Sequence, residues 1–359
     1  MELLRFLYDG AFLSAVLADS HGILLLIITI VSIVVLSKGA DWLVDGSVSL
    51  AMRTRIPTIV IGATIISIGT TTPEAFVSVF AAWMGDGGLA LGNGVGSIIV
   101  DTGLIFGMTC ILAATPAERF ILNRTGWVQA GSATLLVVLS LFAWYRAPDD
   151  PLLHRWVGFL FLVMLTGYMA VSVHWANQRN RLDSIPAAGP YENQEEMRKI
   201  KTSTVPVSWI MILGGLSLVI IGARVLIPCA TEIAFRIGVP TDIIAATIVA
   251  LGTSLPELMT AISAVRKGHT ELTMGNIIGA DILNCFFVIG AAAAVSPLEI
   301  PRTFFIFHFP AMLIILYSFR VFVFMNRNGT FKRWQGVWLL SIYLVYVVLQ
   351  YAFNIEGAH

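Results

Sequence analysis

The sequence predicts an all-α integral membrane protein with ten transmembrane helices, arranged as two inverted five-helix repeats. Its 359 residues are 57% hydrophobic and only 12% charged, whereas an average soluble protein carries about 25% charged residues. Ten apolar stretches approach or exceed the roughly 20 residues that cross a bilayer. A motif in the first half also recurs in the second half. Together these observations place the chain in a membrane.

The predicted spans form two groups of five around one long polar stretch. We expect an N-terminal segment at 1–20, a first repeat at 21–176, a cytoplasmic linker at 177–206 and a second repeat at 207–359. The linker is too short for a folded regulatory domain, which needs about 50 residues or more. The spans are expected near 21–46, 57–83, 88–113, 126–145, 155–176, 207–234, 240–265, 271–295, 303–325 and 334–354.

Basic residues predict the orientation, because cytoplasmic loops are enriched in Lys and Arg. With the N-terminus outside, most of the 22 Lys and Arg residues fall in cytoplasmic segments. The outer segments then hold only Arg5, Arg146, Arg155, Arg236 and Arg302. We therefore expect a multi-pass protein of the cell (inner) membrane, with both termini outside and the central loop in the cytoplasm.

Two copies of one motif lie in the middle of spans 2 and 7. The first is Gly-Thr-Thr-Thr-Pro-Glu at 69–74, and the second is Gly-Thr-Ser-Leu-Pro-Glu at 252–257. Between 57–74 and 240–257, 10 of 18 positions are identical without a gap. Because five spans is an odd number, the second copy enters the membrane from the opposite side. Secondary transporters with this plan bind their cargo near the midplane, between the repeats.

Each motif brings a carboxylate, Glu74 or Glu257, to a depth where charge is costly and is functional by default. Pro73 and Pro256 cannot donate to the carbonyl four residues earlier. Helices 2 and 7 are therefore predicted to break or loosen there and to free backbone oxygens. Neither motif contains His or Cys, and oxygen ligands alone indicate a hard cation such as Ca²⁺ or Na⁺. No cofactor is expected.

A second pair of motifs opens spans 3 and 8, at 92–97 and 275–280. Asp101 follows Ser97 by about one helical turn, and Asn284 follows Ala280 in the same way. These residues are expected to face the carboxylates if the glycines of the motif pack against spans 2 and 7. The two copies differ here, with Ser97 against Ala280 and Asp101 against Asn284.

The paired motifs resemble those of the Ca²⁺/cation antiporter superfamily, specifically its prokaryotic Na⁺/Ca²⁺ exchanger branch. The resemblance covers all ten spans and implies a core of eight helices around four cation sites, across which spans 1 and 6 slide. It implies that Glu74 and Glu257 bind Ca²⁺ and Na⁺ alternately. The remaining implied ligands are Thr70 and Thr253 at the central site, Thr71, Ser97 and the Ser67 carbonyl at an inner Na⁺ site, Ser254 and the Ala250 carbonyl at an outer Na⁺ site, and Asp101 and Asn284 flanking the middle.

The chain departs from the family pattern at several of these positions. The best-understood prokaryotic members resemble its mirror image, with Asn in the first repeat and Asp in the second. Thr71 replaces the usual Ser conservatively. Ala280 stands where a Ser is expected, so the outer Na⁺ site is predicted to be weaker, or Na⁺ coupling to be altered. Asp281, opposite Ile98, has no assigned role.

Taken together, the sequence predicts a secondary active antiporter, not an enzyme, that exchanges Ca²⁺ for Na⁺ by alternating access. An H⁺/Ca²⁺ or K⁺-dependent exchanger is the alternative, because protons could neutralise the same carboxylates. An ion channel and an intramembrane enzyme using both glutamates are weaker alternatives. The expected partners are the ions and the lipid bilayer, with no nucleic acid and no protein partner implied. Lys38 and Asp41, three residues apart in span 1, could pair on one helix face.

Overall fold

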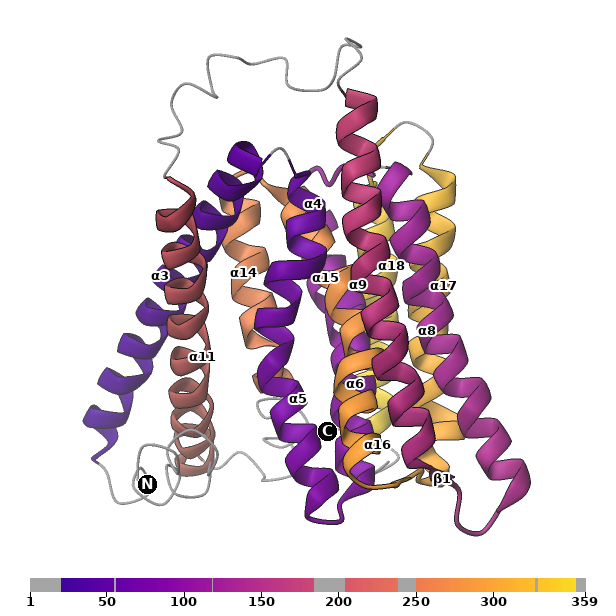
Figure 1. Cartoon of the computed structure of the whole chain (residues 1–359). Coiled ribbons are helices and arrows are strands. Elements are labelled where there is room, and N and C mark those ends of the chain that lie inside the picture. The colour runs from indigo at the N-terminus through magenta and orange to yellow at the C-terminus, as the bar shows by residue number, and fades with distance from the viewer. Residues whose placement is uncertain are drawn as a thin grey trace.

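The computed structural model describes residues 21–54, 56–117, 119–183, 204–237, 250–326 and 329–352. The N-terminal segment expected at 1–20 lies outside these residues, as do most of the linker and the first part of span 7. Among the described residues, eight helices are long and apolar enough to cross a membrane. The shorter helices α14 (Leu255–Arg266) and α18 (Arg333–Ala352) lie among them (Figure 1).

The first half of the chain begins with one long helix and continues through helices that contain π-helical turns. Its elements are α3 (Gly22–Thr54), α4 (Thr58–Ile61), the π-helical η1 (Gly62–Ile66), α5 (Ser67–Trp83), α6 (Gly87–Ile99), the π-helical η2 (Val100–Phe106), α7 (Gly107–Leu112), α8 (Arg119–Arg146), β1 (Leu152–Leu153) and α9 (Arg155–Asp183).

The second half has a similar order of elements. These are α11 (Val205–Arg236), α13 (Ala250–Thr253), α14 (Leu255–Arg266), α15 (Thr270–Leu283), the π-helical η4 (Asn284–Ile289), α16 (Gly290–Val295), β2 (Leu298–Glu299), the π-helical η5 (Phe304–His308), α17 (Phe309–Met325) and α18 (Arg333–Ala352). The offset that relates the motifs also relates these bounds, because α7 maps onto α16 and the start of α3 maps onto the start of α11.

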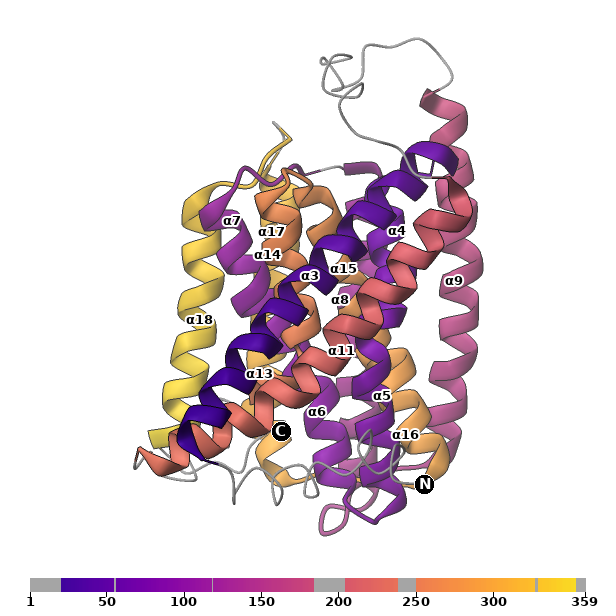
Figure 2. The same cartoon turned by 90° about the vertical axis from the view of Figure 1, so that its left-hand side faces the viewer.

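Helices α3 and α11 form an antiparallel pair that crosses the other helices at a slant (Figure 2). Glycines set their close approach, since a Cβ on Gly39 would lie 2.8 Å from the Gly215 carbonyl oxygen. A Cβ on Gly222, the residue equivalent to Gly39, would lie 2.8 Å from Leu36. Small residues at such crossings let helix backbones come together in a membrane.

The centre of the molecule is formed by α6–η2–α7 and by α15–η4–α16, which are almost wholly buried. Glycines again bring the helices together, because a Cβ on Gly62 would lie 2.6 Å from the Leu272 carbonyl oxygen. Gly279 lies against the Ala63 carbonyl and the Ser67 hydroxyl in the same way. The glycines of the second copy of the motif that opens spans 3 and 8, Gly275 and Gly279, therefore pack against span 2.

The predicted break in helix 2 is wrong for the first motif. Helix α5 runs through Pro73 without interruption, and the irregular segment is the π-helical η1 that precedes it. Each free backbone group in an apolar environment costs several kcal/mol, which favours keeping every hydrogen bond that proline does not remove. In the second motif, α13 ends at Thr253 and α14 begins at Leu255. The interruption there is at Ser254.

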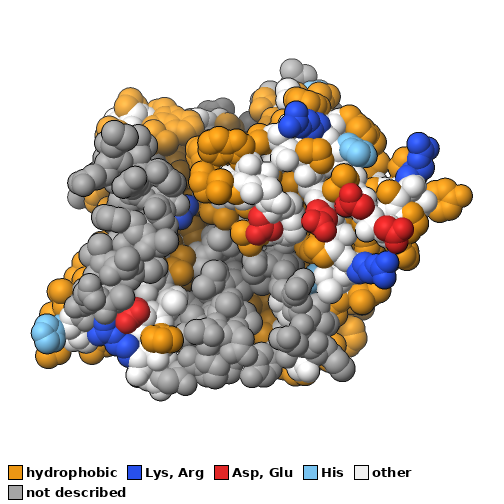
Figure 3. Space-filling view, turned by 90° about the horizontal axis from the view of Figure 1, so that it is seen from below, with side chains coloured by type: hydrophobic (Ala, Val, Ile, Leu, Met, Phe, Trp, Pro, Cys, Tyr) orange, Lys and Arg blue, Asp and Glu red, His pale blue; other side chains and the backbone are white. Residues whose placement is uncertain are grey.

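Short extended segments join the helices at the two ends of the molecule. Strands β1 and β2 pair antiparallel, with Leu152 opposite Glu299, at the lower end in Figure 1. At the other end Pro116 forms an isolated bridge to Thr330. Seen from below, acidic side chains gather on one side of the lower face (Figure 3). The loops that reach this end carry the exposed residues Asp86, Asp149, Asp150 and Glu299.

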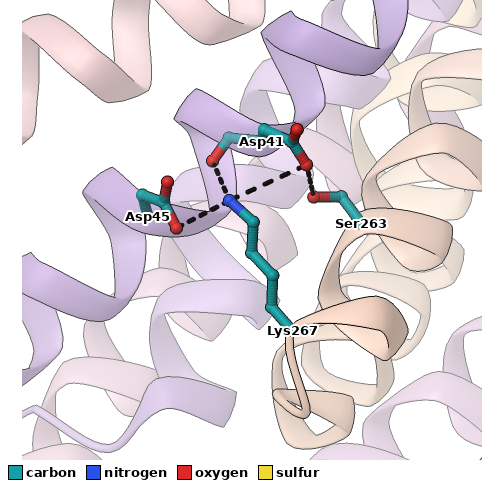
Figure 4. Close-up of polar contacts among 4 residues, drawn as sticks. All are labelled: Asp41, Asp45, Ser263 and Lys267. Atoms are coloured by element: carbon teal, nitrogen blue, oxygen red, sulfur yellow. Dashed lines mark hydrogen bonds and ion pairs between the residues drawn. The ribbon is translucent and has the colours of Figure 1, made fainter. Parts of the chain in front are cut away.

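A polar cluster ties α3 to the end of α14 (Figure 4). Lys267 Nζ lies 2.7 Å from Asp45 Oδ1 and donates to the Asp41 backbone oxygen at 2.9 Å. The Ser263 hydroxyl donates to Asp41 Oδ1 at 2.6 Å. Asp41 therefore bonds to α14, a helix distant in sequence, and not only to neighbours on its own helix.

Candidate cation site

The two glutamates of the repeated motif lie close together in the interior. Glu74 is in α5 and Glu257 is in the first turn of α14, and each is 1% exposed. They are within electrostatic range of one another. Both carboxyl oxygens of Glu74 and the Oε2 atom of Glu257 have no hydrogen-bond partner among the described residues. Glu257 lies in the first turn of α14, where the helix N-terminus stabilises nearby negative charge.

Asp101 joins this pair from the π-helical η2. Its side chain is fully buried, and it lies within electrostatic range of both glutamates. The Ser254 side chain lies beside Asp101, and the Thr70 hydroxyl lies beside Glu257. The structure therefore brings together residues from both copies of the motif and from the helix that follows the first copy.

Asparagines at equivalent positions hold the surrounding helices in place. Asn93 of α6 donates through Nδ2 to the Glu74 backbone oxygen at 3.1 Å and to the Ser78 hydroxyl at 2.8 Å. The Asn276 side-chain oxygen accepts from Thr70 at 3.4 Å. The Ser67 hydroxyl donates to the Gly62 carbonyl at 2.6 Å and contacts the Asn276 backbone oxygen at 3.2 Å. These bonds fix the turn of α5 that carries the glutamate.

The other predicted residues lie on α5, α6, η4 and α13. Thr71, Ser97 and Asn284 are buried, and the Thr71 hydroxyl and Asn284 Oδ1 have no hydrogen-bond partner in the described part of the chain. Thr253 is half-buried at the end of α13. Ala250 begins α13 and would contribute only its backbone carbonyl.

This arrangement offers many oxygens to a hard cation. No three His, Cys, Asp or Glu side chains in the described ranges are grouped tightly enough to hold a metal by themselves. Hydroxyl, amide and carbonyl oxygens lie near the carboxylates, and this is the donor mixture that Ca²⁺ accepts in proteins.

One polar cluster beside the site was not assigned by the sequence. Asp281 of α15 accepts hydrogen bonds from Thr102 of η2 and from Gln129 of α8. Asp281 stood out only as a carboxylate without a counterpart in the first repeat. Gln129 carried no signal, since a lone glutamine in an apolar span has many possible partners.

Comparison with known proteins identifies the family. Residues 24–174 and 207–352 match the sodium/calcium exchanger protein family. The chain belongs to this family. The two matched regions cover most of both halves, so membership does not rest on the two motifs alone.

Relatives of this exchanger-family chain occur in archaea and bacteria. It is 28% identical over 346 residues to the sodium/calcium exchanger MaX1 of Methanosarcina acetivorans, covering 90% of this chain and 97% of that protein. It is 29% identical over 331 residues to the putative antiporter CaxA of Alkalimonas amylolytica, covering 91% and 98%. A solved structure of the sodium–calcium exchanger NCX_Mj has the same fold, with a TM-score of 0.71 at 24% identity over 91% of this chain and 99% of that one.

Proposed function

We propose that this protein is a secondary active antiporter that exchanges Ca²⁺ for Na⁺ across the membrane. The observation that carries the proposal is the meeting of Glu74, Glu257 and Asp101 in the interior of a chain that belongs to the sodium/calcium exchanger family. Three buried carboxylates with unpartnered oxygens favour binding of cations that bring positive charge. MaX1, a relative along nearly its whole length, is named for the same activity.

The proposed ligands are those expected from the sequence. Glu74 and Glu257 would hold Ca²⁺ or Na⁺ in turn, with the remaining oxygens completing each coordination shell. Those oxygens come from Thr70, Thr253, Thr71, Ser254, Ser97, Asp101, Asn284 and the carbonyls of Ser67 and Ala250. Supporting this assignment, the Ser254 hydroxyl lies at the N-cap position of α14 but makes no capping hydrogen bond.

Obligatory exchange follows from the cost of burying charge. A site with several bare carboxylates is expensive to enclose in a low-dielectric interior, because an unpaired buried charge keeps its full desolvation penalty. The site is therefore expected to cross between the two faces only when cations occupy it. Ca²⁺ and Na⁺ that use the same oxygens then replace each other, so the flow of one drives the other.

Alternating access is proposed to involve two inverted five-helix repeats, with α3 and α11 sliding across the rest. The crossing of α3 and α11 supports this, since Gly39 and Gly222 occupy equivalent places in it. Both termini are proposed to lie outside and the central loop inside. The end of α9 and the start of α11 lie at the same end of the molecule, opposite the start of α3 (Figure 1), which is compatible with this orientation.

Transport by the purified chain in lipid vesicles tests the proposal. Radiolabelled Ca²⁺ uptake is measured under an outward gradient of Na⁺, of K⁺ or of protons, each imposed alone. The proposal predicts uptake driven by the Na⁺ gradient. Uptake driven only by the proton gradient would identify an H⁺/Ca²⁺ exchanger instead, and uptake without any counter-ion would indicate a channel.

A further inference from the structure

Asp281 is a buried carboxylate that the proposed exchange mechanism does not use. It lies in α15 and is 1% exposed. Its Oδ2 atom accepts hydrogen bonds from Gln129 Nε2 at 2.6 Å and from the Thr102 hydroxyl, and both donors are neutral groups. Its Oδ1 atom is also buried and has no hydrogen-bond partner among the residues described. One oxygen of the carboxylate is thus held in place while the other is available to a ligand.

The free oxygen belongs to the same polar region as the central site. Asp281 lies within electrostatic range of Asp101 and of Glu257. Thr102, which binds Asp281, directly follows Asp101 in η2, and both Asp101 oxygens are buried without a hydrogen-bond partner in the described part. With Glu74, the region contains four carboxylates. When all four are ionised, Ca²⁺ balances two of the charges, and enclosing the rest requires further cations or protons.

At positions 280 and 281 the second repeat lacks the hydroxyl of the first repeat and has a carboxylate instead. The residue equivalent to Ser97 is Ala280, which has no hydroxyl, and the residue equivalent to Ile98 is Asp281. Adjacent helical residues are about 100° apart around the axis, given 3.6 residues per turn. Relative to the Ser97 hydroxyl in the first repeat, the side-chain oxygen of the second repeat therefore lies further around its helix. It belongs to the Asp281 carboxylate and points toward α8 and η2.

We propose that Asp281 and Asp101 bound a subsite for a monovalent alkali cation beside the central site, with Thr102 and Gln129 positioning Asp281. Carboxylate and hydroxyl oxygens are the ligands that hard cations prefer. The transport role of this subsite rests on the proposed exchange function, whereas binding of the cation can be measured without transport.

Thermal unfolding of the purified full-length chain tests binding directly. Wild type and Asp281→Asn are compared in choline chloride, NaCl and KCl at equal ionic strength. A cation that binds only the native state raises the unfolding temperature. We expect an alkali salt to stabilise wild type relative to choline, and Asp281→Asn to lose much of this shift. The salt whose stabilising effect Asp281→Asn reduces more identifies Na⁺ or K⁺ as the occupant of the subsite, because Na⁺ also binds the proposed central site in both proteins.

Two further variants separate positioning from general damage to the core. Gln129→Leu keeps the carboxylate but removes one of its two neutral donors, so the rise in unfolding temperature caused by the alkali salt should decrease. Thr109→Val removes a buried hydroxyl that donates to the Ile105 carbonyl one turn earlier, and it should leave the stabilisation by the alkali salt intact. If Asp281→Asn does not fold, Gln129→Leu takes its place in the test. A rise in unfolding temperature with the alkali salt equal to that of wild type would then overturn the subsite.

In vesicles, Asp281→Asn should make the Na⁺ dependence of Ca²⁺ uptake shallower, because one cation-binding carboxylate is lost. An alkali shift in Asp281→Asn equal to that of wild type, or no alkali preference in wild type, would overturn the subsite. If wild type shows no Na⁺-driven Ca²⁺ uptake, the proposed exchange fails, while the unfolding experiment still decides whether the subsite exists.

Discussion

Helices α3 and α11 occupy equivalent places in the two halves but carry opposite charges at equivalent positions. Asp41 of α3 is bound by Lys267 and Ser263 at the end of α14, outside the cation site. Its counterpart Arg224 of α11 is half-buried and lies within electrostatic range of Glu74, one of the carboxylates of the candidate site. The two halves of the chain therefore have a similar arrangement of helices but different charges at equivalent positions. The shared geometry suits alternating access, and the differences can make the two faces unequal in affinity.

The largest effect is expected where the two halves are alike. Glu74→Gln and Glu257→Gln should each abolish Ca²⁺ uptake, because each removes a charge from a site built by both copies. The matched control is Glu271→Gln, which changes a half-exposed glutamate 3.5 Å from His269 and should transport normally. Uptake like that of wild type in either site variant would contradict the assignment of that glutamate.

A smaller effect is expected where the halves differ in charge. Arg224→Gln removes a positive charge near Glu74, so the apparent affinity for Ca²⁺ should rise, because the repulsion between Arg224 and the bound cation is lost. Asp41→Asn, the change at the equivalent residue, should leave Ca²⁺ affinity unchanged. The concentration dependence of Ca²⁺ uptake measures both. A weaker affinity in Arg224→Gln would mean that Arg224 supports the site by other means.

The contact between α3 and α14 should contribute modestly to stability. Lys267 and Asp45 are partly exposed, with 26% and 51% of their side chains accessible, and such ion pairs are worth about 1 kcal/mol or less. A double-mutant cycle of Asp45→Asn and Lys267→Met, read by thermal unfolding, should give a coupling of this size. No coupling would show that the contact does not hold α3 in place.

The smallest effect is expected from restoring one oxygen to the second repeat. Ala280→Ser makes position 280 match Ser97, and the Na⁺ dependence of Ca²⁺ uptake should become steeper because a neutral ligand is added. The measurement is the slope of uptake against Na⁺ concentration. An unchanged slope would show that Ala280 does not limit Na⁺ binding.

Much of the fold could be predicted because apolar length and the repeat offset are visible in the sequence. The first motif placed Glu74 in a buried helix, and the offset placed Glu257 opposite it. The π-helical η1 and η2 were not predicted, since a change of backbone hydrogen-bond register needs no special residue type. For the same reason, the passage of α5 through Pro73 could not be foreseen from the proline alone.

The hydrogen-bond and ion-pair partners of the charged side chains also could not be predicted from the sequence. Lys38 is near Asp41 along the chain, yet Asp41 bonds to Lys267 and Ser263 from a distant helix. Asp281 could be noticed as an unmatched carboxylate, but only the packing of α8 and η2 against α15 shows that Gln129 and Thr102 bind it. Contacts between helices depend on how their faces are turned, which a repeat offset does not specify.

Equilibrium binding of radiolabelled Ca²⁺ to the purified chain tests the central claim most directly, namely that one site built from both motifs binds Ca²⁺ and Na⁺ in turn. We expect wild type to bind Ca²⁺, Na⁺ to displace it competitively, and Glu74→Gln and Glu257→Gln each to lose binding. Ca²⁺ binding that Na⁺ does not displace, or binding that survives either substitution unchanged, would contradict the account.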